Sequence, residues 1–280
     1  MKQARFACVF FLLAAGCDDS APESDAAVDA SAMDAATDAS LGDDADCSGE
    51  YVRALIGDVV DVEGEGVAGA NVQACLNTID GRWLCLSPVQ SEESGAFRIE
   101  LAPDNRCLER AAVRMSADDV VSDYCSPPLD SEVVETGIML ALSTTTAWSV
   151  DGSTLSHDSG LIFDAASPEA AAQHAERIAA GGLEGTSHCQ AVQLGLSSSL
   201  GLTPEGFVRD LTLRRVPAPG LPDATPVDIV VVGGLYGELP DGSVVAEGDA
   251  HVIATGQVEG GTVDVDVSIP FLTWIGVRPR

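Results

Sequence analysis

The apolar residues of this chain come in short runs that alternate with polar residues, and this pattern restricts the fold most. Residues 96–101 and 262–269 are the clearest examples, with an apolar side chain at every second position. Successive side chains of a strand point to opposite faces of a sheet, so this period predicts strands with one buried face. Glycine turns separate the runs. Regular short strands with turns between them predict a mainly β protein of the sandwich type.

The expected strands form two groups, which we interpret as two β domains, residues 47–142 and 143–280. They are expected at 54–61, 67–75, 96–101, 111–115 and 137–142, and then at 144–150, 161–163, 189–195, 206–215, 227–232, 244–256 and 262–269. The second domain is expected to be mostly antiparallel. One short helix is predicted from Ser167 to about Ala180, because Ser167 is a favourable N-cap and Pro168 a favourable first residue. Phe271 and Trp274 are expected to hold the C-terminus against a core.

The first sixteen residues resemble a bacterial lipoprotein signal peptide. Lys2 and Arg5 precede an apolar run from Phe6 to Ala15, and small residues lead into Cys17. Ten apolar residues are too few to span a bilayer, where about 20 are needed, but they suit a secretory signal. Residues 1–16 are therefore predicted to be removed and Cys17 to be lipidated. Two or three acyl chains would then hold the mature protein on a membrane.

Residues 17–46 are predicted to be the lipidated cysteine followed by an extended tether. Positions 18–46 carry ten acidic residues and no basic or aromatic ones. Such a segment cannot bury enough apolar surface to offset the entropy lost on ordering. We interpret it as a solvated spacer between the lipid and the folded part.

The acidic balance excludes whole classes of partner. The net charge is −30, and removal of Lys2 and Arg5 makes it −32; the tether carries −10 of this, which leaves −22 for residues 47–280. After Lys2 the chain has no lysine, which excludes a lysine Schiff base and a lysine-containing phosphate loop. Nucleic-acid binding depends on basic residues, so no nucleic-acid partner is expected. The surface would also repel anionic headgroups, which leaves membrane attachment to the lipid.

Six cysteines remain after Cys8 and Cys17 are set aside, and they are predicted to form disulfides. They are Cys47, Cys75, Cys85, Cys107, Cys125 and Cys189. An even number in an exported chain favours disulfides, and the paired spacing typical of zinc sites is missing. Six cysteines allow fifteen connectivities, so the sequence fixes none. Proximity along the chain suggests Cys75–Cys85, Cys107–Cys125 and Cys47–Cys189.

Three motifs of the first group resemble a known family. They are GDVVD at 57–61, GVAGANV at 66–72 and EESGAFRI at 92–99. Together they are similar to the carboxypeptidase regulatory-like domain, with Glu92 and Ser91 where that family usually has Asp and Thr. The resemblance covers residues 48–142 and implies a seven-stranded, transthyretin-like β-sandwich. It also implies a folding, spacing or binding module without catalytic residues. The zinc peptidase that such domains accompany uses an H-x-x-E pair. In this chain, none of the four histidines has a glutamate three residues later.

Catalytic candidates are few and scattered along the sequence. They are His157, Asp158, His174, His188 and His251. A catalytic triad is assembled across a fold, so the adjacent polar residues at 156–159 are interpreted as a loop. The alternative, an envelope hydrolase with its site in the second domain, depends on two of these histidines and a carboxylate meeting in one cleft.

Metal and cofactor sites are not expected. Asp61, Glu63 and Glu65 imitate half of a calcium loop, but Val72 stands at its twelfth position, so a hairpin turn is favoured. Asp264 and Asp266 share one strand face in a chain rich in carboxylates. The glycines at 233–237 lead into a turn signal, where a dinucleotide site needs a helix.

These features favour a non-catalytic protein, anchored by lipid in a bacterial cell envelope, that binds or spaces a partner. The partner would be a glycan, peptidoglycan or another envelope protein. The sequence chooses neither the ligand nor the membrane, which leaves the outer membrane, the cell surface and the periplasmic face open.

Overall fold

The computed structural model describes residues 47–118, 120–184 and 188–280, all of which belong to one compact unit. The predicted signal peptide, Cys17 and the tether lie outside these residues. The protein is mainly β, with 54% strand and 8% helix, which confirms the predicted class. None of the helices in the described ranges has the length and apolar character needed to cross a membrane.

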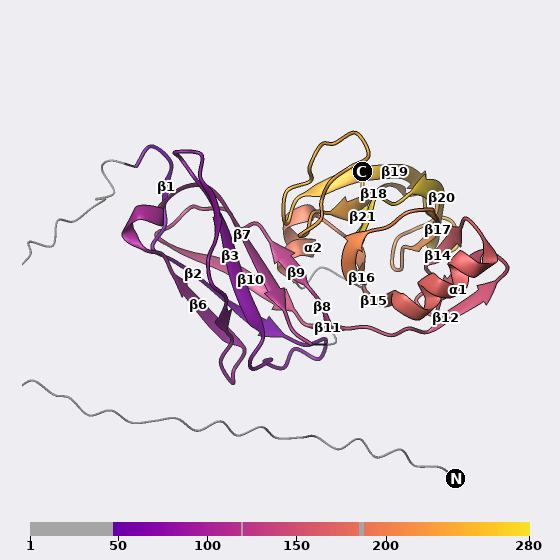
Figure 1. The fold of residues 1–280 in the computed structure, drawn as a ribbon, viewed down its shortest axis with the longest axis horizontal. Coiled ribbons are helices and arrows are strands. Elements are labelled where there is room, and N and C mark those ends of the chain that lie inside the picture. Colours follow the sequence, from indigo (N-terminus) through magenta and orange to yellow (C-terminus); the bar gives the residue numbers. More distant parts are fainter. Residues whose placement is uncertain (1–46, 119, 185–187) are drawn as a thin grey trace, which may run out of the picture. The chain divides into compact units, whose positions relative to one another are not determined.

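The strands before residue 144 build the first sandwich, drawn in indigo to magenta in Figure 1. Its six-stranded sheet contains β1 (Glu50–Tyr51), β3 (Asn71–Thr78), β4 (Trp83–Cys85), β5 (Val89–Gln90), β7 (Cys107–Ser116) and β9 (Asp123–Cys125). Its three-stranded sheet has the order β10 (Val133–Leu140), β2 (Ala54–Val60), β6 (Ala96–Glu100). A short pair joins β8 (Val120–Val121) to β11 (Leu142–Ser143). β2 and β10 are parallel, whereas the other pairs of this sandwich are antiparallel.

The first core lies between these two sheets and follows from the alternation in the sequence. Phe97 and Ile99 of β6 are buried against Leu55 of β2 and Leu76 of β3, in one apolar cluster. Gly95 has a φ of +86° in the turn before β6, a conformation that favours glycine. The alternation predicted for residues 96–101 and the glycine turn before them are therefore both present.

The strands after residue 147 build the second sandwich from two five-stranded sheets, all of whose pairs are antiparallel. One sheet has the order β12 (Trp148–Asp151), β13 (Thr154–His157), β14 (Ile162–Ala165), β17 (Leu211–Pro217), β20 (Thr262–Ser268). The other has the order β15 (Ala179–Glu184), β16 (Ser198–Phe207), β21 (Phe271–Pro279), β18 (Pro226–Val232), β19 (Ala250–Gln257). The largest apolar cluster includes Phe163, Leu213 and Ile275 from both sheets, with Val263, Val265 and Val267 on its edge strand.

The predicted helix is confirmed as α1 (Pro168–Arg177), and the side chain of Ser167 accepts a hydrogen bond from the backbone N–H of Ala170. The predicted end near Ala180 is wrong, because Ala179–Glu184 forms β15 instead. Gly181 in that strand packs against the carbonyl of Ser143, an approach that leaves no room for a side chain. Gly181 therefore allows close strand packing where the helix was expected to end.

Two other predictions for the second half are wrong. The predicted strand at 189–195 is a short helix, α2 (Cys189–Leu194), which Gly195 ends in the left-handed conformation with φ +67°. The prediction also left out β21 and most of β16 as strands. β21 is buried along most of its length, so its sequence lacks alternation and gives no period-2 signal.

All six predicted cysteines form disulfides, but only one predicted pairing is right. Cys75 and Cys85 are register partners on β3 and β4, as proximity suggested. The other two bonds are Cys47–Cys107 and Cys125–Cys189, in place of the predicted Cys107–Cys125 and Cys47–Cys189. β1 pairs with β7, which brings Cys47 to Cys107, and α2 packs on β9, which brings Cys189 to Cys125. Sheet and helix packing therefore decide the pairing, and distance along the chain does not.

Candidate functional site

The four histidines named from the sequence have separate surroundings. His157 ends β13, where its Nδ1 lies 2.9 Å from Ser159 Oγ and its Nε2 lies 3.2 Å from Thr145 Oγ. Burial lowers the pKa of His157 and favours the neutral ring. The residue is 7% exposed, so it is a buried strand residue beside the turn and not part of an open loop. His174 lies on α1, and His251 lies on β19.

The carboxylates weighed as cation ligands have partners within the protein. Asp61 Oδ1 accepts hydrogen bonds from the backbone N–H groups of Glu63 and Glu65, at 3.0 and 2.9 Å. This is the predicted hairpin turn. Asp264 and Asp266 bind the guanidinium groups of Arg215 and Arg214 at 2.7 and 2.6 Å. Within the described ranges, no three His, Cys, Asp or Glu side chains gather as metal ligands.

A buried polar cluster that the sequence did not indicate joins the two sandwiches. His188, just before α2, places its Nε2 3.4 Å from Ser199 Oγ on β16. Its Nδ1 lies 3.6 Å from Asp123 Oδ2 on β9. Asp123 also accepts hydrogen bonds from the backbone N–H groups of Tyr124 and Leu140, at 2.9 and 2.8 Å. The order serine, histidine, aspartate is that of a catalytic triad.

All three side chains of this cluster are buried. Asp123 and Ser199 are 0% exposed and His188 is 1% exposed. Ser198 Oγ donates to the carbonyl of Pro217 inside the second sandwich, so Ser199, next on the strand, points to the opposite face. A cavity of about 340 Å³ touches both serines, but its other lining residues include Pro217 and Pro219, on the Ser198 side. The arrangement therefore stabilises the contact between the sandwiches and offers no open nucleophile.

A second polar cluster at the same contact uses Tyr124. Its hydroxyl donates to the carboxylate of Glu205, with O–O distances of 2.7 and 2.6 Å. Burial and the charge of Glu205 raise the pKa of Tyr124, so the phenol stays protonated. Nearby, burial also raises the pKa of Glu247. Glu205 is thus already engaged within the protein.

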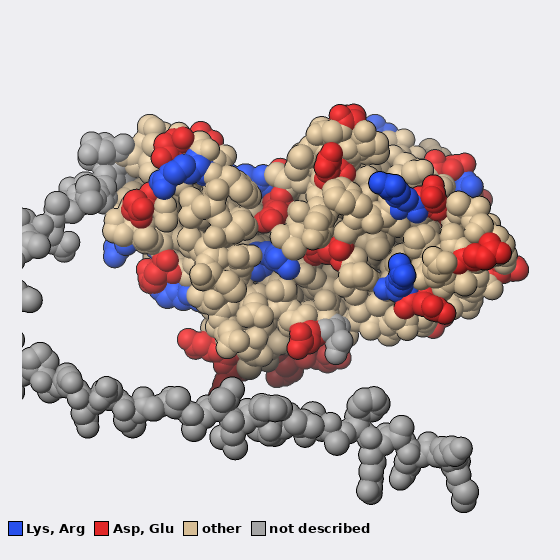
Figure 2. Space-filling model, in the orientation of Figure 1, with Lys and Arg blue, Asp and Glu red and all other residues tan. Residues whose placement is uncertain are grey.

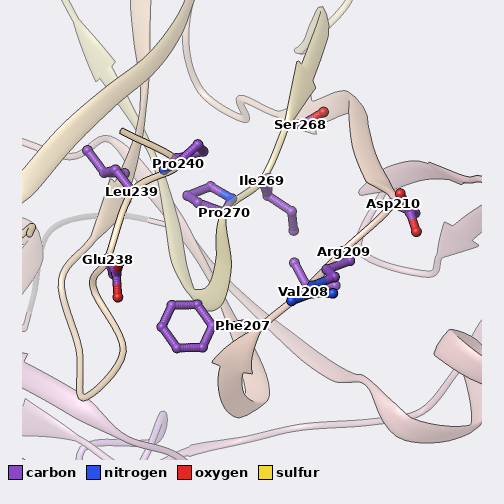
Figure 3. Close-up of a pocket in the computed structure, with 10 residues that line it drawn as sticks. All are labelled: Phe207, Val208, Arg209, Asp210, Glu238, Leu239, Pro240, Ser268, Ile269 and Pro270. Carbon is purple, nitrogen blue, oxygen red and sulfur yellow. The ribbon is translucent and has the colours of Figure 1, made fainter. Parts of the chain in front are cut away.

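An open groove on the second sandwich is suited to a ligand. Figure 3 shows its main cavity, which has a volume of about 530 Å³. Three segments build it: 207–210 from the last residue of β16 onward, 238–240 between β18 and β19, and 268–270 from the last residue of β20 to the start of β21. Apolar side chains of Phe207, Val208, Leu239, Pro240, Ile269 and Pro270 line it. Arg209, Asp210, Glu238 and Ser268 add polar groups. Small-molecule sites combine an apolar lining with a few polar groups in this way and in this range of volume.

Phe207 lies where the main cavity of the groove meets a second cavity. It lines both the main cavity and a neighbouring one of about 310 Å³ that also touches α1. Phe207 is 58% exposed, and its ring meets that of the 46% exposed Tyr236 edge-on, with centroids 5.7 Å apart. Sequence reasoning placed Phe207 inside an expected strand and missed this role. The short motif GFVRD at 206–210, an aromatic residue beside paired charges, was the only available signal.

Comparison with known proteins adds no family. No family model matches the chain, and no curated protein matches it. Among solved structures, 3-chlorocatechol 1,2-dioxygenase from Rhodococcus opacus 1CP is similar over 35% of this chain and 62% of its own, with 12% identity and a TM-score of 0.24. That likeness is too weak to carry an argument about fold or function. The resemblance to the carboxypeptidase regulatory-like domain rests on its three motifs alone.

Proposed function

We propose that this protein is an exported, lipid-anchored, non-catalytic component of a bacterial cell envelope. In this proposal the second sandwich binds a ligand through the groove at Phe207. The first sandwich stands between the tether and the binding sandwich as a spacer. Three disulfides support the compartment, because such bonds persist in oxidising, exported environments.

The exposed aromatic pair beside the groove carries the binding part of the proposal. Phe207 and Tyr236 keep about half of their surface in solvent, although the same sandwich buries Phe163 and Phe271 completely. Exposed aromatic rings next to an open cavity are typical of surfaces that recognise a partner. The groove also has hydrogen-bonding groups of both charges, which suits a polar ligand such as a glycan.

Substitution of Cys17 tests the anchor. We expect Cys17→Ser to abolish incorporation of labelled palmitate and to move the protein from the membrane fraction to the soluble fraction, because the acyl chains are the proposed attachment. Cys8→Ser is the matched control, since this cysteine would leave with the signal, and both readouts should be unchanged. Membrane retention of the Cys17→Ser protein would contradict the anchoring proposal.

A hydrolase is the second candidate, and the Ser199–His188–Asp123 order is the observation that favours it. A fluorophosphonate probe reacts with activated serines and distinguishes the two candidates. We expect no labelling of the wild-type protein, because Ser199 is fully buried. Labelling that disappears in Ser199→Ala but persists in Ser198→Ala, its neighbour on the opposite face, would establish the hydrolase instead.

A further inference from the structure

Among the described residues, most arginines of this acidic protein form ion pairs with carboxylates, and two of the four without such a pair line one cavity. Twelve arginines follow the predicted signal peptide. Eight of them form ion pairs with carboxylates in the described structure: Arg53, Arg82, Arg98, Arg110, Arg214, Arg215, Arg278 and Arg280. Figure 2 shows basic groups lying beside acidic ones on the visible face. Arg106 donates to the carbonyl of Leu101, and Arg114 lies near Glu247 at the contact between the sandwiches.

The remaining two, Arg177 and Arg209, line the same cavity of about 310 Å³ beside Phe207. Arg177 ends α1, and Arg209 lies in the turn between β16 and β17. Among the described side chains, neither has a carboxylate within 4.0 Å. A basic residue at a helix C-terminus is favourable on its own, which explains Arg177. It does not explain why another arginine without an ion pair, Arg209, comes to the same cavity from another element.

The other charged groups at this cavity leave the arginines available. Glu205 also lines this cavity, and its carboxylate accepts hydrogen bonds from the hydroxyl of Tyr124 and from the backbone N–H of Leu235. His174 also lines the cavity, and burial together with Arg177 lowers its pKa and favours the neutral ring. The negative charge of Asp210, which lines the main cavity, acts on His174 in the opposite direction and raises its pKa by a smaller amount. The cavity thus presents two guanidinium groups without an ion pair, a neutral imidazole and the hydrogen-bonded carboxylate of Glu205 at the edge of an aromatic ring.

We propose that this cavity recognises a saccharide bearing a single carboxylate, with the sugar ring against Phe207 and the carboxylate on Arg177 and Arg209. A planar guanidinium matches a carboxylate through two parallel hydrogen bonds. The flat, exposed ring of Phe207 connects this cavity to the main groove, where a further sugar would lie. A net charge of −22 on residues 47–280 repels polyanions and acidic peptides, so one isolated carboxylate is favoured over a charged polymer. This inference rests on the proposed binding function and specifies its ligand.

The test measures binding of the full chain, purified in detergent, to an array of oligosaccharides. Each glycan ending in glucuronate, galacturonate or sialate is printed beside its neutral parent. We expect at least one acidic glycan to bind about tenfold or more tightly than its parent, because a charge-assisted pair has that strength. Titration calorimetry then compares the best acidic glycan with its parent at low and high salt, where salt should weaken only the acidic one.

Two double variants assign the effect to the cavity. Arg177→Gln/Arg209→Gln should reduce affinity for the acidic glycan about tenfold or more and leave the neutral parent unchanged. Arg53→Gln/Arg82→Gln removes the same charge from exposed ion pairs elsewhere and should change neither affinity. Both arginines of the cavity are exposed, so folding should be intact, which thermal unfolding checks.

The outcomes separate this inference from the proposed function. Acidic and neutral glycans would bind equally well if the carboxylate made no contact. If Phe207→Ala then abolished this binding, the carboxylate inference would be overturned and the groove would remain a binding site. Binding of an acidic glycan could also depend on Arg177 and Arg209 but be unchanged by Phe207→Ala. That result would support the carboxylate contact and contradict the role of the groove. Failure of every acidic glycan, or arginine-dependent binding of a hexaglutamate peptide instead, would overturn the inference.

Discussion

Replacing both cysteines of the Cys125–Cys189 disulfide by alanine will lower the free energy of unfolding by about 4 kcal/mol. The bond joins residues 64 positions apart, and closing a loop of that size in the unfolded chain removes about 4 kcal/mol of conformational freedom at 25 °C in the chain-entropy model. It also links β9 of the first sandwich to α2 of the second. Urea unfolding of the oxidised protein and of Cys125→Ala/Cys189→Ala measures the loss.

Cys75→Ala/Cys85→Ala is the matched control for loop length. This bond spans only 10 positions, so the same model gives a loss of about 3 kcal/mol. The informative result is which variant loses more free energy of unfolding, because both variants remove two cysteines and one bond. A larger loss for the short loop would show that local packing of β3 and β4 outweighs chain entropy. A second unfolding transition in the Cys125→Ala/Cys189→Ala variant alone would show that this bond makes the sandwiches unfold together.

The disulfides also show what sequence reasoning reaches and where it ends. The number of bonds followed from the even set of six cysteines between residues 47 and 189, which favours disulfides. The partners did not, because they depend on which strands pair. The buried cluster was missed for the same reason: Asp123 lies two residues before Cys125, and His188 directly precedes Cys189. The Cys125–Cys189 bond is therefore the information that predicts the proximity of Asp123 and His188.

Elements with one buried face were predictable, and elements buried on both faces were not. β6 and β20 alternate, and α1 begins with a capping serine, so local chemistry was sufficient to place them. β21 is buried at seven consecutive residues, from Phe271 to Val277, and carries no period. α2 has only six residues, and both tertiary packing and Gly195 decide its form. In these segments tertiary contacts override local preference.

The groove was beyond sequence reasoning for a further physical reason. Three segments that are distant along the chain supply its walls, and each is a turn or a strand end. Turns have weak sequence constraints, so their residues can serve recognition without disturbing either core. Phe207 differs from the buried Phe271 only in position: the two are register partners on β16 and β21, and Phe207 is the one left in solvent. The sequence does not show exposure, which is what distinguishes Phe207 from a core aromatic residue.

Trp274 on β21 is the side chain whose loss should weaken the contact between the sandwiches most. It is 0% exposed, and its Nε1–H donates to the carbonyl of Ser122 at 2.7 Å. Its apolar cluster includes Tyr124 and Leu140 of the first sandwich and Val232 of the second. Trp274→Ala should lower the free energy of unfolding by about 3–5 kcal/mol, the range found when large aromatic core residues are truncated. Trp274→Phe keeps an aromatic ring and should lose about 1–3 kcal/mol, since the Ser122 carbonyl is left without its donor.

The other two tryptophans report on unfolding of the two sandwiches separately, because each lies in a different sandwich. Trp83 on β4 is 50% exposed, so Trp83→Ala should change stability by about 1 kcal/mol or less and serves as the control. Trp148 on β12 reports on the second sandwich, where its Nε1–H donates to the carbonyl of Ile178. Adding Trp148→Phe to Trp274→Ala leaves Trp83 as the only fluorescent tryptophan, and adding Trp83→Phe leaves Trp148. The fluorescence of these two variants should follow separate unfolding transitions. Coincident transitions, or a loss below about 1 kcal/mol for Trp274→Ala, would contradict this role, because a fully packed indole cannot be removed from a shared core at so small a cost.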